Sequence, residues 1–289
     1  MNNSPLTVGF IGLGLIGGSM AKAIKKAHPE YTLIASSRSL PPLQAAKDEG
    51  VIDIITEDVS TYFDKCDFIF LCTPVVTISK YFTQLKNIIK SDCILTDVGS
   101  VKGNVHKAAV ATGLERNFIG GHPMAGNETC GYSNSTEKFL LGAKYIITKS
   151  EYTTELQLAM YENLIKDIGA IPVVMDPELH DKTAAVISHV PHLVAAALAK
   201  IAKDNEDPNQ FMHTLAAGGF KDTTRIAAST PEMWSQICKA NSEAICAMLE
   251  NYIDRLNIVL DSIKNNTEED GVSYIAELFT ETREYRNTF

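Results

Sequence analysis

The feature that most constrains the fold is a glycine-rich turn near the start of the chain. Residues 12–17 read GLGLIG; they follow an apolar run over residues 6–11 and precede a helical pattern that begins near Gly18. Glycines at this spacing let the chain turn tightly, approach a pyrophosphate and pack a helix closely against a strand. Free N–H groups at the start of that helix attract phosphate. The turn therefore predicts a dinucleotide site whose cofactor contacts are Gly12, Gly14, Leu15, Ile16 and Gly17.

Short apolar runs alternate with helical stretches through the first 176 residues. The runs are rich in Val, Ile and Phe, and the stretches between them place apolar residues three and four positions apart. Such alternation produces a largely parallel sheet covered by helices. We predict strands over residues 6–11, 32–35, 68–72, 93–98, 118–120, 145–148 and 171–175, and helices over residues 20–27, 78–89 and 154–168.

The pattern changes after Asp176 and Pro177, where the strand signal nearly vanishes. Apolar residues from Trp234 to Ile263 step by threes and fours, which predicts one long amphipathic helix. The fold class is therefore a Rossmann-type α/β domain over residues 1–176 followed by an all-helical domain over residues 177–289. So long an apolar stripe needs a partner, and we expect a homodimer through the helical domain. A monomer with a large helical cap is the alternative.

The end of the second predicted strand bears on cofactor choice. An acidic residue there would bind the ribose hydroxyl of NAD, but the segment contains Ser36, Ser37 and Arg38 and no acid. The serines can bond a hydroxyl or a phosphate, and the arginine can pair with a 2′-phosphate or stack on adenine. The cofactor is expected to be NAD, with NADP not excluded. Thr73 and Pro74, which follow a predicted strand, complete the expected cofactor site.

Composition excludes several classes of partner. The 26 Lys and Arg residues against 35 Asp and Glu residues give a formal net charge of −9, which does not attract nucleic acid or anionic lipid. No apolar run approaches the roughly 20 residues that cross a bilayer, and the first residues lack a signal-peptide pattern. The six cysteines are scattered without a Cys-x-x-Cys pair. We expect a cytoplasmic protein without a metal site or membrane partner.

Four further motifs carry groups suited to chemistry. Residues 97–102 read DVGSVK and residues 120–126 read GGHPMAG, each at the end of a predicted strand, where ligands bind an open α/β sheet. Residues 188–192 read SHVPH and residues 218–225 read GGFKDTTR in the helical half. Each alone has a plain structural explanation: a histidine in a turn, or two histidines near a helix kink at Pro191.

Taken together and in this order, the motifs resemble those of the prephenate and arogenate dehydrogenases of tyrosine biosynthesis, across nearly the whole chain. The resemblance runs through GLGLIGGS, DVGSVK, GGHPMAG, SHVPH and FKDTTRIA. Nicotinamide-linked 3-hydroxyacid dehydrogenases share the Rossmann half and the helices but lack the GGHPMAG and DTTRIA pair. The resemblance implies an oxidative decarboxylation in which prephenate and NAD(P)+ give 4-hydroxyphenylpyruvate, CO2 and NAD(P)H.

This reaction needs a base, because the ring alcohol loses a hydride from carbon and a proton from oxygen. We expect the neutral imidazole of His122 to accept the proton, and loss of the ring carboxylate as CO2 to restore aromaticity. The resemblance implies that Ser100 bonds the same hydroxyl and helps to orient His122.

Prephenate is a dianion, so its site needs fixed positive donors. The resemblance identifies Arg225 as the substrate-binding arginine, with Asp222 three residues earlier to orient it; a structural pair joining two helices is the alternative. His192 matches a histidine on the substrate side. Further expected contacts are His189, Gly218, Glu128 and Lys221, of which the lysine favours the keto acid prephenate over the amino acid arogenate.

Two other functions stay open on the sequence alone. An arogenate dehydrogenase performs the same step on a substrate with an amino side chain. A non-catalytic dinucleotide sensor would bind the cofactor without turning over, and would have no reason to keep Ser100, His122 and Arg225 together.

Overall fold

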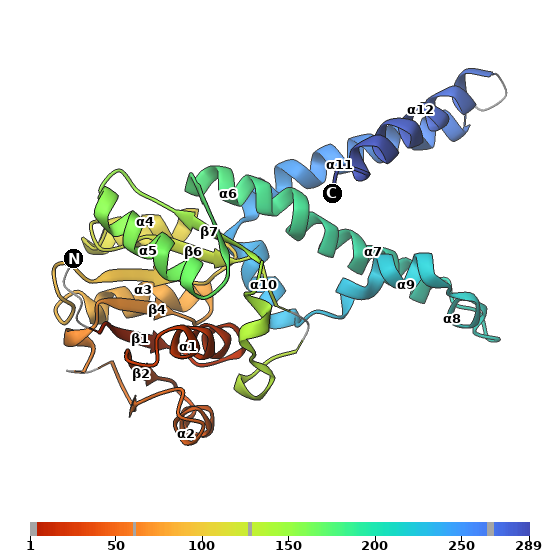
Figure 1. Ribbon diagram of the computed structural model, residues 1–289. Helices are drawn as coiled ribbons and strands as arrows, with labels where there is room; N and C mark the ends of the chain where they lie inside the picture. Colours follow the sequence, from red (N-terminus) through yellow and green to blue (C-terminus); the bar gives the residue numbers. More distant parts are fainter. Residues whose placement is uncertain (1–4, 60–61, 127–128, 265–268) are drawn as a thin grey trace. The chain divides into compact units, whose positions relative to one another are not determined.

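The computed structural model describes residues 5–59, 62–126, 129–264 and 269–289. The chain divides into two compact units, Met1–Ser242 and Glu243–Phe289. Figure 1 shows the order of the elements, with the strands in the first unit.

The first unit is built on a five-stranded parallel sheet with the order β3-β2-β1-β4-β5. Most of these strands are buried runs of apolar residues, as expected for a sheet covered on both faces. The order reverses between β1 and β4, which is the switch point where dinucleotides bind. The strands are β1 (Thr7–Ile11), β2 (Thr32–Ser36), β3 (Ile54–Thr56), β4 (Phe68–Leu71) and β5 (Ile94–Asp97).

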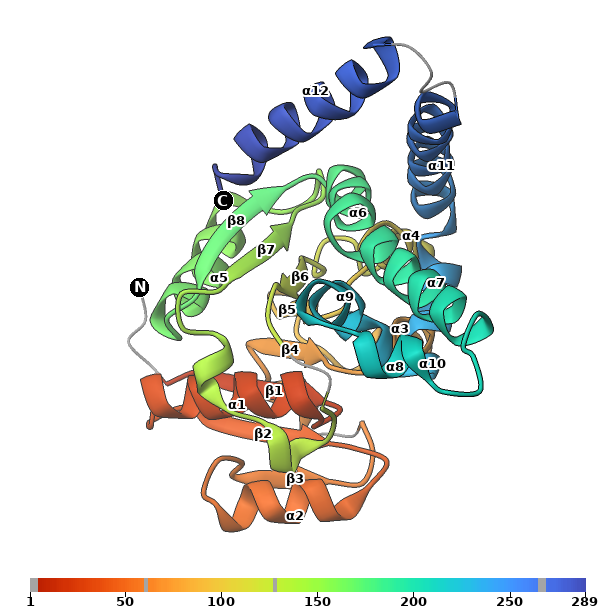
Figure 2. The ribbon, with the colours of Figure 1, turned by 90° about the vertical axis from the view of Figure 1, so that its right-hand side faces the viewer.

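Helices cover both faces of this sheet and form two hydrophobic cores. One core contains residues of α1 (Leu15–Ala27) and α2 (Leu40–Asp48), and the other contains residues of α3 (Val75–Leu85) and α4 (Gly103–Thr112). Helix α3 buries Ile78, Phe82 and Leu85, whose spacing of four and three puts them on one face. Figure 2 shows the same layers from a second direction.

The last three strands form a separate sheet with the order β6-β7-β8, which corrects the expectation of one largely parallel sheet. Strand β6 (Gly120–Pro123) runs antiparallel to β7 (Lys144–Thr148), and β7 runs parallel to β8 (Ile171–Met175). Among the described residues, one isolated bridge, from Leu95 to Phe118, joins the segment before β6 to the first sheet. The strand expected over residues 118–120 is thus shifted, and His122 lies inside β6 instead of after it. Strand β3 was not predicted, because three residues are too short for a strand pattern.

Beyond β8, every secondary-structure element in the described residues is a helix or helical turn, as predicted. Helix α6 begins at Pro177, and Asp176 caps it by accepting hydrogen bonds from the N–H groups of Glu178 and Leu179. A π-helical turn over Ala185–His189 joins α6 to the next helix and ends two residues before Pro191. The elements are α5 (Glu155–Asp167) before β8, then α6 (Pro177–Ala184), α7 (Val190–Asp204), α8 (Phe211–Leu215), α9 (Gly218–Thr224), a 3-10 turn (Arg225–Ala228) and α10 (Pro231–Ala240).

The single long helix predicted from Trp234 to Ile263 was wrong. Helix α10 ends at Ala240, and a new helix, α11 (Ser242–Lys264), follows. The break lies at Asn241, whose side chain donates a hydrogen bond of 2.9 Å to the backbone oxygen of Asp181. A buried side-chain contact of this kind overrides the apolar spacing that continues across the break.

The second unit consists of the rest of α11 and of α12 (Glu269–Arg286). Helix α11 keeps a row of large apolar side chains exposed in the single chain, as a subunit interface requires. The exposed residues are Tyr252, Ile253, Leu256, Ile258, Leu260 and Ile263.

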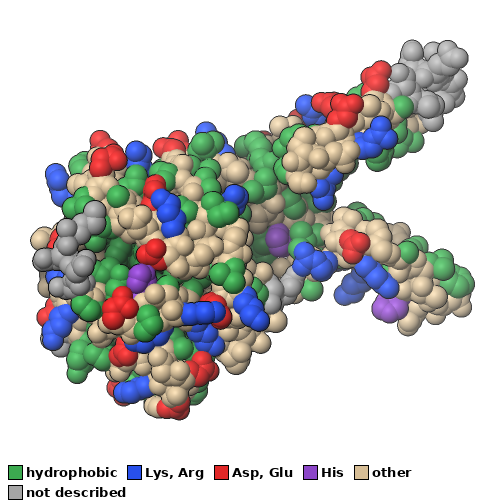
Figure 3. All heavy atoms as spheres, in the orientation of Figure 1, with side chains coloured by type: hydrophobic (Ala, Val, Ile, Leu, Met, Phe, Trp, Pro, Cys, Tyr) green, Lys and Arg blue, Asp and Glu red, His purple; other side chains and the backbone are tan. Residues whose placement is uncertain are grey.

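One helical stretch in the described part of the chain, Pro177–Asp204, is long and apolar enough to cross a membrane, with a hydropathy of 1.5. This corrects the expectation that no run approaches that length. The stretch carries buried His180 and His189, which bond to protein groups. On the face shown in Figure 3, Lys and Arg side chains alternate with Asp and Glu over the sheet-containing unit.

Candidate active site

The glycine turn adopts the geometry that a dinucleotide needs. Gly12 has a φ of +92°, and a Cβ there would lie 2.7 Å from the backbone oxygen of Cys72. A Cβ at Gly17 would lie 2.6 Å from the oxygen of Gly12, so α1 packs tightly against the turn. A Cβ at Gly14 would meet no atom within 4 Å, so this backbone is open to a ligand. Gly12 thus forms the tight turn, Gly17 allows the close packing of α1, and Gly14 leaves room for the pyrophosphate.

Two unsatisfied features fit a bound dinucleotide. Helix α1 starts without a side-chain cap, which leaves its first N–H groups, at Leu15 and Ile16, available for phosphate. Next to this turn, just after β4, the buried Oγ1 of Thr73 has no hydrogen-bond partner among the residues that the structure describes. A buried hydroxyl without a partner indicates a group that a ligand completes.

The residues expected at the adenosine side follow β2. Ser36 is buried as the last residue of the strand, and its backbone oxygen accepts a hydrogen bond of 2.7 Å from the N–H of Gly12. Ser37 is half-buried, and Arg38 and Pro74 are exposed. Ser36 therefore shapes the turn through its backbone, while Ser37 and Arg38 present their side chains.

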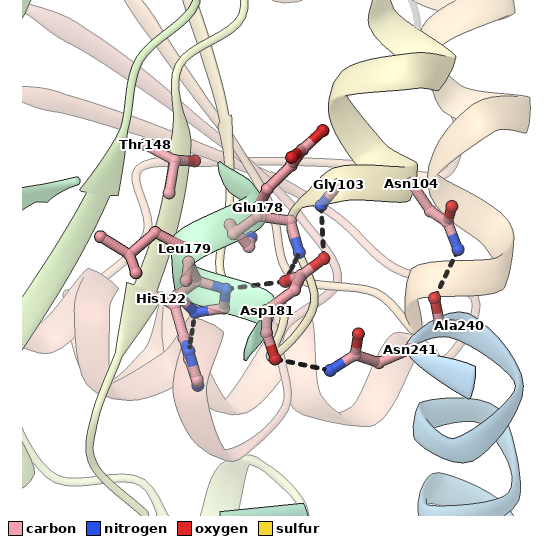
Figure 4. A network of polar contacts seen from close by, with 12 residues as sticks. Gly103, Asn104, His122, Thr148, Glu178, Leu179, Asp181, Ala240 and Asn241 are labelled. Carbon is pink, nitrogen blue, oxygen red and sulfur yellow. Dashed lines mark hydrogen bonds and ion pairs between the residues drawn. The ribbon is translucent and has the colours of Figure 1, made fainter. Parts of the chain in front are cut away.

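His122 is the first of three hydrogen-bonded side chains, a series that was not predicted from the sequence. Its Nδ1 lies 2.8 Å from Nε2 of His180 on α6, and Nδ1 of His180 lies 2.8 Å from the carboxylate of Asp181. Figure 4 shows the chain, with His122 reaching from β6 toward α6. Because Asp181 accepts a hydrogen bond from His180, Nε2 of His180 is the acceptor for the N–H on Nδ1 of His122. Nε2 of a neutral His122 is then unprotonated, as a base requires.

Asp181 is fixed by the start of another helix. Its carboxylate oxygens accept hydrogen bonds of 2.7 and 2.8 Å from the N–H groups of Lys102 and Gly103, at the N-terminus of α4. Burial raises the pKa of Asp181, but the hydrogen bond from His180 and these two N–H groups outweigh it, so the pKa is lowered overall. The carboxylate therefore stays ionised and holds His180 in one tautomer.

The surroundings of His122 keep its imidazole neutral. Burial lowers the pKa of His122 well below its usual value, and electrostatic interaction with the neighbouring His180, Lys102 and His189 side chains lowers it further. Ser100 is half-buried in the loop after β5, and the N–H of the preceding Gly99 donates a hydrogen bond of 2.9 Å to Asp97. Both expected catalytic residues thus lie on segments tied to the carboxyl end of β5.

Two more histidines come from the π-helical turn and α7. His189 is buried; its Nδ1 lies 3.1 Å from the side-chain nitrogen of Asn241, and burial lowers its pKa to about 4. His192 donates from Nδ1 to the backbone oxygen of Ser188 at 2.8 Å, and its ring stacks on Trp234 with a centroid separation of 4.0 Å. Nδ1 of His192 is therefore used within the helix, which leaves Nε2 for a ligand.

The expected residues of the GGFKDTTR motif lie on α9 and the turn that follows it. Gly218, Lys221, Asp222 and Arg225 are all exposed in the single chain. Both α9 and the 3-10 turn of Arg225 pack against α7, the helix of His192. The last expected contact, Glu128, lies outside the described residues.

Comparison with known proteins places these features in one family. Residues 20–174 match the model described as prephenate dehydrogenase, nucleotide-binding domain, and residues 176–279 match prephenate dehydrogenase, dimerization domain. The prephenate dehydrogenase of Bacillus subtilis (strain 168) is 35% identical over 289 residues, which cover 99% of this chain and 77% of that protein. The chain belongs to the prephenate dehydrogenase family.

Solved structures of similar proteins agree with this family of soluble enzymes. The prephenate dehydrogenase of A. aeolicus in complex with hydroxyphenyl propionate and NAD+ has a TM-score of 0.90 and 32% identity, with 99% of this chain and 100% of that chain covered. The arogenate dehydrogenase of Synechocystis has a TM-score of 0.84 and 29% identity, with 97% and 100% covered. These confirm the predicted fold class of a Rossmann-type domain followed by a helical domain.

In this member of the prephenate dehydrogenase family, the sequence alone did not predict roles for His180, Asp181 and Asn241. No local motif marks them, because each acts on a residue far away in the sequence. The one available signal was a histidine next to an aspartate in the first two turns of α6, a helix that begins directly after β8.

Proposed function

We propose that the chain is an NAD+-dependent prephenate dehydrogenase, which converts prephenate to 4-hydroxyphenylpyruvate and CO2 while reducing NAD+. The single observation that carries the proposal is the hydrogen-bonded chain from His122 through His180 to Asp181. This series supplies an oriented, neutral base on β6. The same protein has a dinucleotide-binding turn between β1 and α1. Together with the family, this arrangement favours an enzyme over a non-catalytic sensor.

His122 acts as the base at the ring hydroxyl. Its Nε2 accepts the hydroxyl proton as a hydride leaves the ring carbon that bears this hydroxyl. His180 and Asp181 stabilise the resulting imidazolium. Loss of CO2 from the ring then leaves an aromatic oxygen anion, and the imidazolium returns the proton to give the phenol. His122 is therefore restored at the end of each turnover, and no proton is released overall. Ser100 binds the same hydroxyl and limits its rotation.

The dinucleotide is held by the glycine turn, the start of α1 and Thr73, with Leu15, Ile16 and Pro74 around it; when bound, NAD+ supplies the hydride acceptor. Gly12, Gly14 and Gly17 let the backbone approach the pyrophosphate. Ser37 and Arg38 face the adenosine ribose, and the lack of an acid there leaves NADP+ as a second cofactor.

The two carboxylates of prephenate are held by the helical part. Arg225 pairs with the ring carboxylate, with Asp222 orienting it, and His192 binds the side chain through its free Nε2. His189, Gly218, Lys221 and Glu128 complete the substrate site. The packing of α9 and the Arg225 turn against α7 supports this grouping.

Arogenate dehydrogenase is the second candidate, favoured by the likeness to the Synechocystis enzyme. Lys221 favours prephenate, since a cation suits a keto acid better than a side chain that carries an ammonium group. The test mixes the purified chain with prephenate or arogenate, each with NAD+ and with NADP+, and follows the absorbance of the reduced nicotinamide. We expect turnover with prephenate and NAD+; turnover with arogenate alone replaces the proposal by the second candidate, and no turnover with either refutes both.

We further propose a cytoplasmic homodimer, with the nucleotide-binding domain over residues 1–176 and the substrate domain over residues 177–289. The match of residues 176–279 to a dimerization domain and the exposed apolar row of α11 support the dimer. The boundary is supported by the end of β8 at Met175 and the start of α6 at Pro177. Light scattering of the purified chain measures the oligomer directly.

A further inference from the structure

A buried lysine that has no role in this mechanism lies beside the strand of His122. Lys102 follows Ser100 by two residues, and none of its surface is exposed. Its Nζ pairs with the carboxylate of Asp97 and donates a hydrogen bond of 2.7 Å to the backbone oxygen of Gly121. Because removing two charges from water costs about as much as their attraction returns, a buried pair of this kind is weak evidence for stability alone.

We propose that Lys102 is a positioning residue for the reaction: held by Asp97, its ammonium fixes the peptide group between Gly121 and His122 and so aims the His122 imidazole at the substrate hydroxyl. This inference rests on the proposed function, because it takes His122 as the base.

The ion pair forms hydrogen bonds with both polar backbone groups of Gly121. Asp97 accepts a hydrogen bond of 3.3 Å from the N–H of Gly121, and Lys102 donates to its oxygen. The other oxygen of Asp97 accepts from the N–H of Gly99, next to Ser100. One buried pair therefore ties together the two segments that carry the proposed catalytic residues.

The two glycines before His122 are needed for these hydrogen bonds. A Cβ at Gly121 would lie 2.6 Å from the backbone oxygen of Asp97, and a Cβ at Gly120 would lie 3.1 Å from Cδ of Lys102. Strand β6 can reach the ion pair only because these positions lack side chains. This gives a physical reason for the GG that precedes His122 in the motif.

Lys102 also reaches His122 by a second path, through the ring instead of the backbone. Its N–H donates to the Asp181 carboxylate, which accepts from His180, whose ring bonds His122. A displacement of the Lys102 segment therefore disturbs both the backbone and the ring of the base.

The charge of Lys102 adds to its position. Burial is the largest cause that lowers the pKa of His122, and the electrostatic effects of His180, Lys102 and His189 follow in that order. The facing anions are already engaged: Asp97 pairs with Lys102, and Asp181 accepts from His180 and two N–H groups. Removal of the ammonium therefore raises the pKa of His122 and protonates the base at a higher pH.

The chain offers a matched control in Lys90 and Asp67. Their Nζ and Oδ1 atoms lie 2.6 Å apart, and Asp67 also accepts a hydrogen bond from the N–H of Thr7 at the start of β1. This pair joins the amino ends of strands β1 and β4, whereas ligands bind at the carboxyl ends. It joins the same two residue types as the Lys102 pair, but it is partly exposed, and no contact among the described residues links it to His122.

The test uses the double variant Asp97→Asn/Lys102→Met, which leaves no unpaired buried charge, beside Lys90→Met. We measure kcat, the KM for NAD+, the pH profile of kcat/KM with prephenate, and the titration of the His122 ring by NMR, with His122→Asn to assign the signal. In the double variant we expect kcat to fall roughly 10-fold to 100-fold, as for other residues that orient a reacting group. We also expect the acidic limb and the ring titration to move up by less than about 1 pH unit, because loss of the Asp97 carboxylate offsets part of the effect of losing the ammonium. The KM for NAD+ should change little.

A folded double variant with the wild-type kcat and ring titration overturns the proposal, as does a Lys90→Met variant with equal losses. If the double variant does not fold, Lys102→Arg replaces it, because it keeps the charge but changes the reach to Gly121. We then expect a lower kcat with the ring titration preserved, and an unchanged kcat overturns the proposal. The ring titration needs no substrate, so it tests Lys102 separately from the proposed function, which fails if the wild-type chain does not turn over prephenate.

Discussion

The cofactor site and the catalytic site of this chain are built from different materials. The cofactor site is mostly backbone from one short segment, in which Gly12, Gly14 and Gly17 set the path and α1 presents its N–H groups. The catalytic site is a series of side chains from separate elements, in which His122 depends on His180 and Asp181. A backbone site survives the loss of most side chains near it, whereas a hydrogen-bonded series is disturbed at every link. Substitutions should therefore separate binding of the cofactor from turnover.

The largest separation is expected for His122→Asn. The amide lacks a basic nitrogen, so we expect kcat to fall roughly 10²-fold to 10⁴-fold, the usual effect of losing a positioned base. Binding of NAD+, measured by calorimetry, should stay close to wild type because the glycine turn is untouched. Wild-type turnover in this variant removes His122 from the mechanism.

Acid should also act unequally on the two sites, because the catalytic half buries neutral histidines. The pKa of His189 is lowered by burial to about 4, so between its ordinary value of 6.5 and about 4 the unfolded chain binds more protons than the folded one. Neutral His189 therefore makes its full contribution to the free energy of unfolding above pH 6.5. This contribution is lost as the pH drops toward 4, by on the order of 2 to 3 kcal/mol for a fully buried group.

Thermal unfolding between neutral pH and pH 4.5 measures this loss. His189→Gln should flatten the pH dependence of Tm, since glutamine does not titrate. A slope as steep as that of the wild type would assign the acid sensitivity to other groups, of which His106, with a pKa also lowered by burial to about 4, is the first candidate.

The same difference explains what could be predicted from the sequence. The dinucleotide turn, six of the seven strands proposed and the helical second half follow from local patterns of glycine and apolar residues, and the structure has them. The shifted strand at Gly120, the break at Asn241 and the chain from His122 to Asp181 depend on contacts between distant residues. The spacing of residues along the chain does not predict such contacts. The sequence therefore predicted His122 as the base but not the residues that orient it.

Replacement of His180 tests whether the base depends on its neighbour. His180→Phe removes the acceptor for the N–H of His122 and the donor to Asp181, and we expect kcat to fall roughly 10-fold to 100-fold. His180→Gln, whose amide oxygen can accept the same hydrogen bond, should recover part of the loss. Equal activity in the two variants would mean that only the volume of the ring matters.

Arg225→Ala should act on substrate binding instead of on the cofactor. Because Arg225 is exposed in the single chain, we expect the KM for prephenate to rise by roughly 30-fold, at the lower end for a charged pair at a binding site. Arg225→Lys should restore only part of the affinity, because an ammonium cannot bind a carboxylate through two parallel hydrogen bonds. A normal KM for prephenate in Arg225→Ala refutes the pairing with the ring carboxylate.

The smallest effect is expected at the one place where the cofactor site relies on side chains. Arg38 is exposed after β2, so its pairing with a 2′-phosphate is screened by water and salt. In Arg38→Ala we expect the KM for NADP+ to rise by roughly 3-fold to 5-fold, with the KM for NAD+ unchanged and the difference smaller at high salt. An equal rise for both cofactors would place Arg38 on the adenine instead of the phosphate. Because either result leaves the glycine turn in place, turnover at saturating cofactor should stay at the wild-type rate.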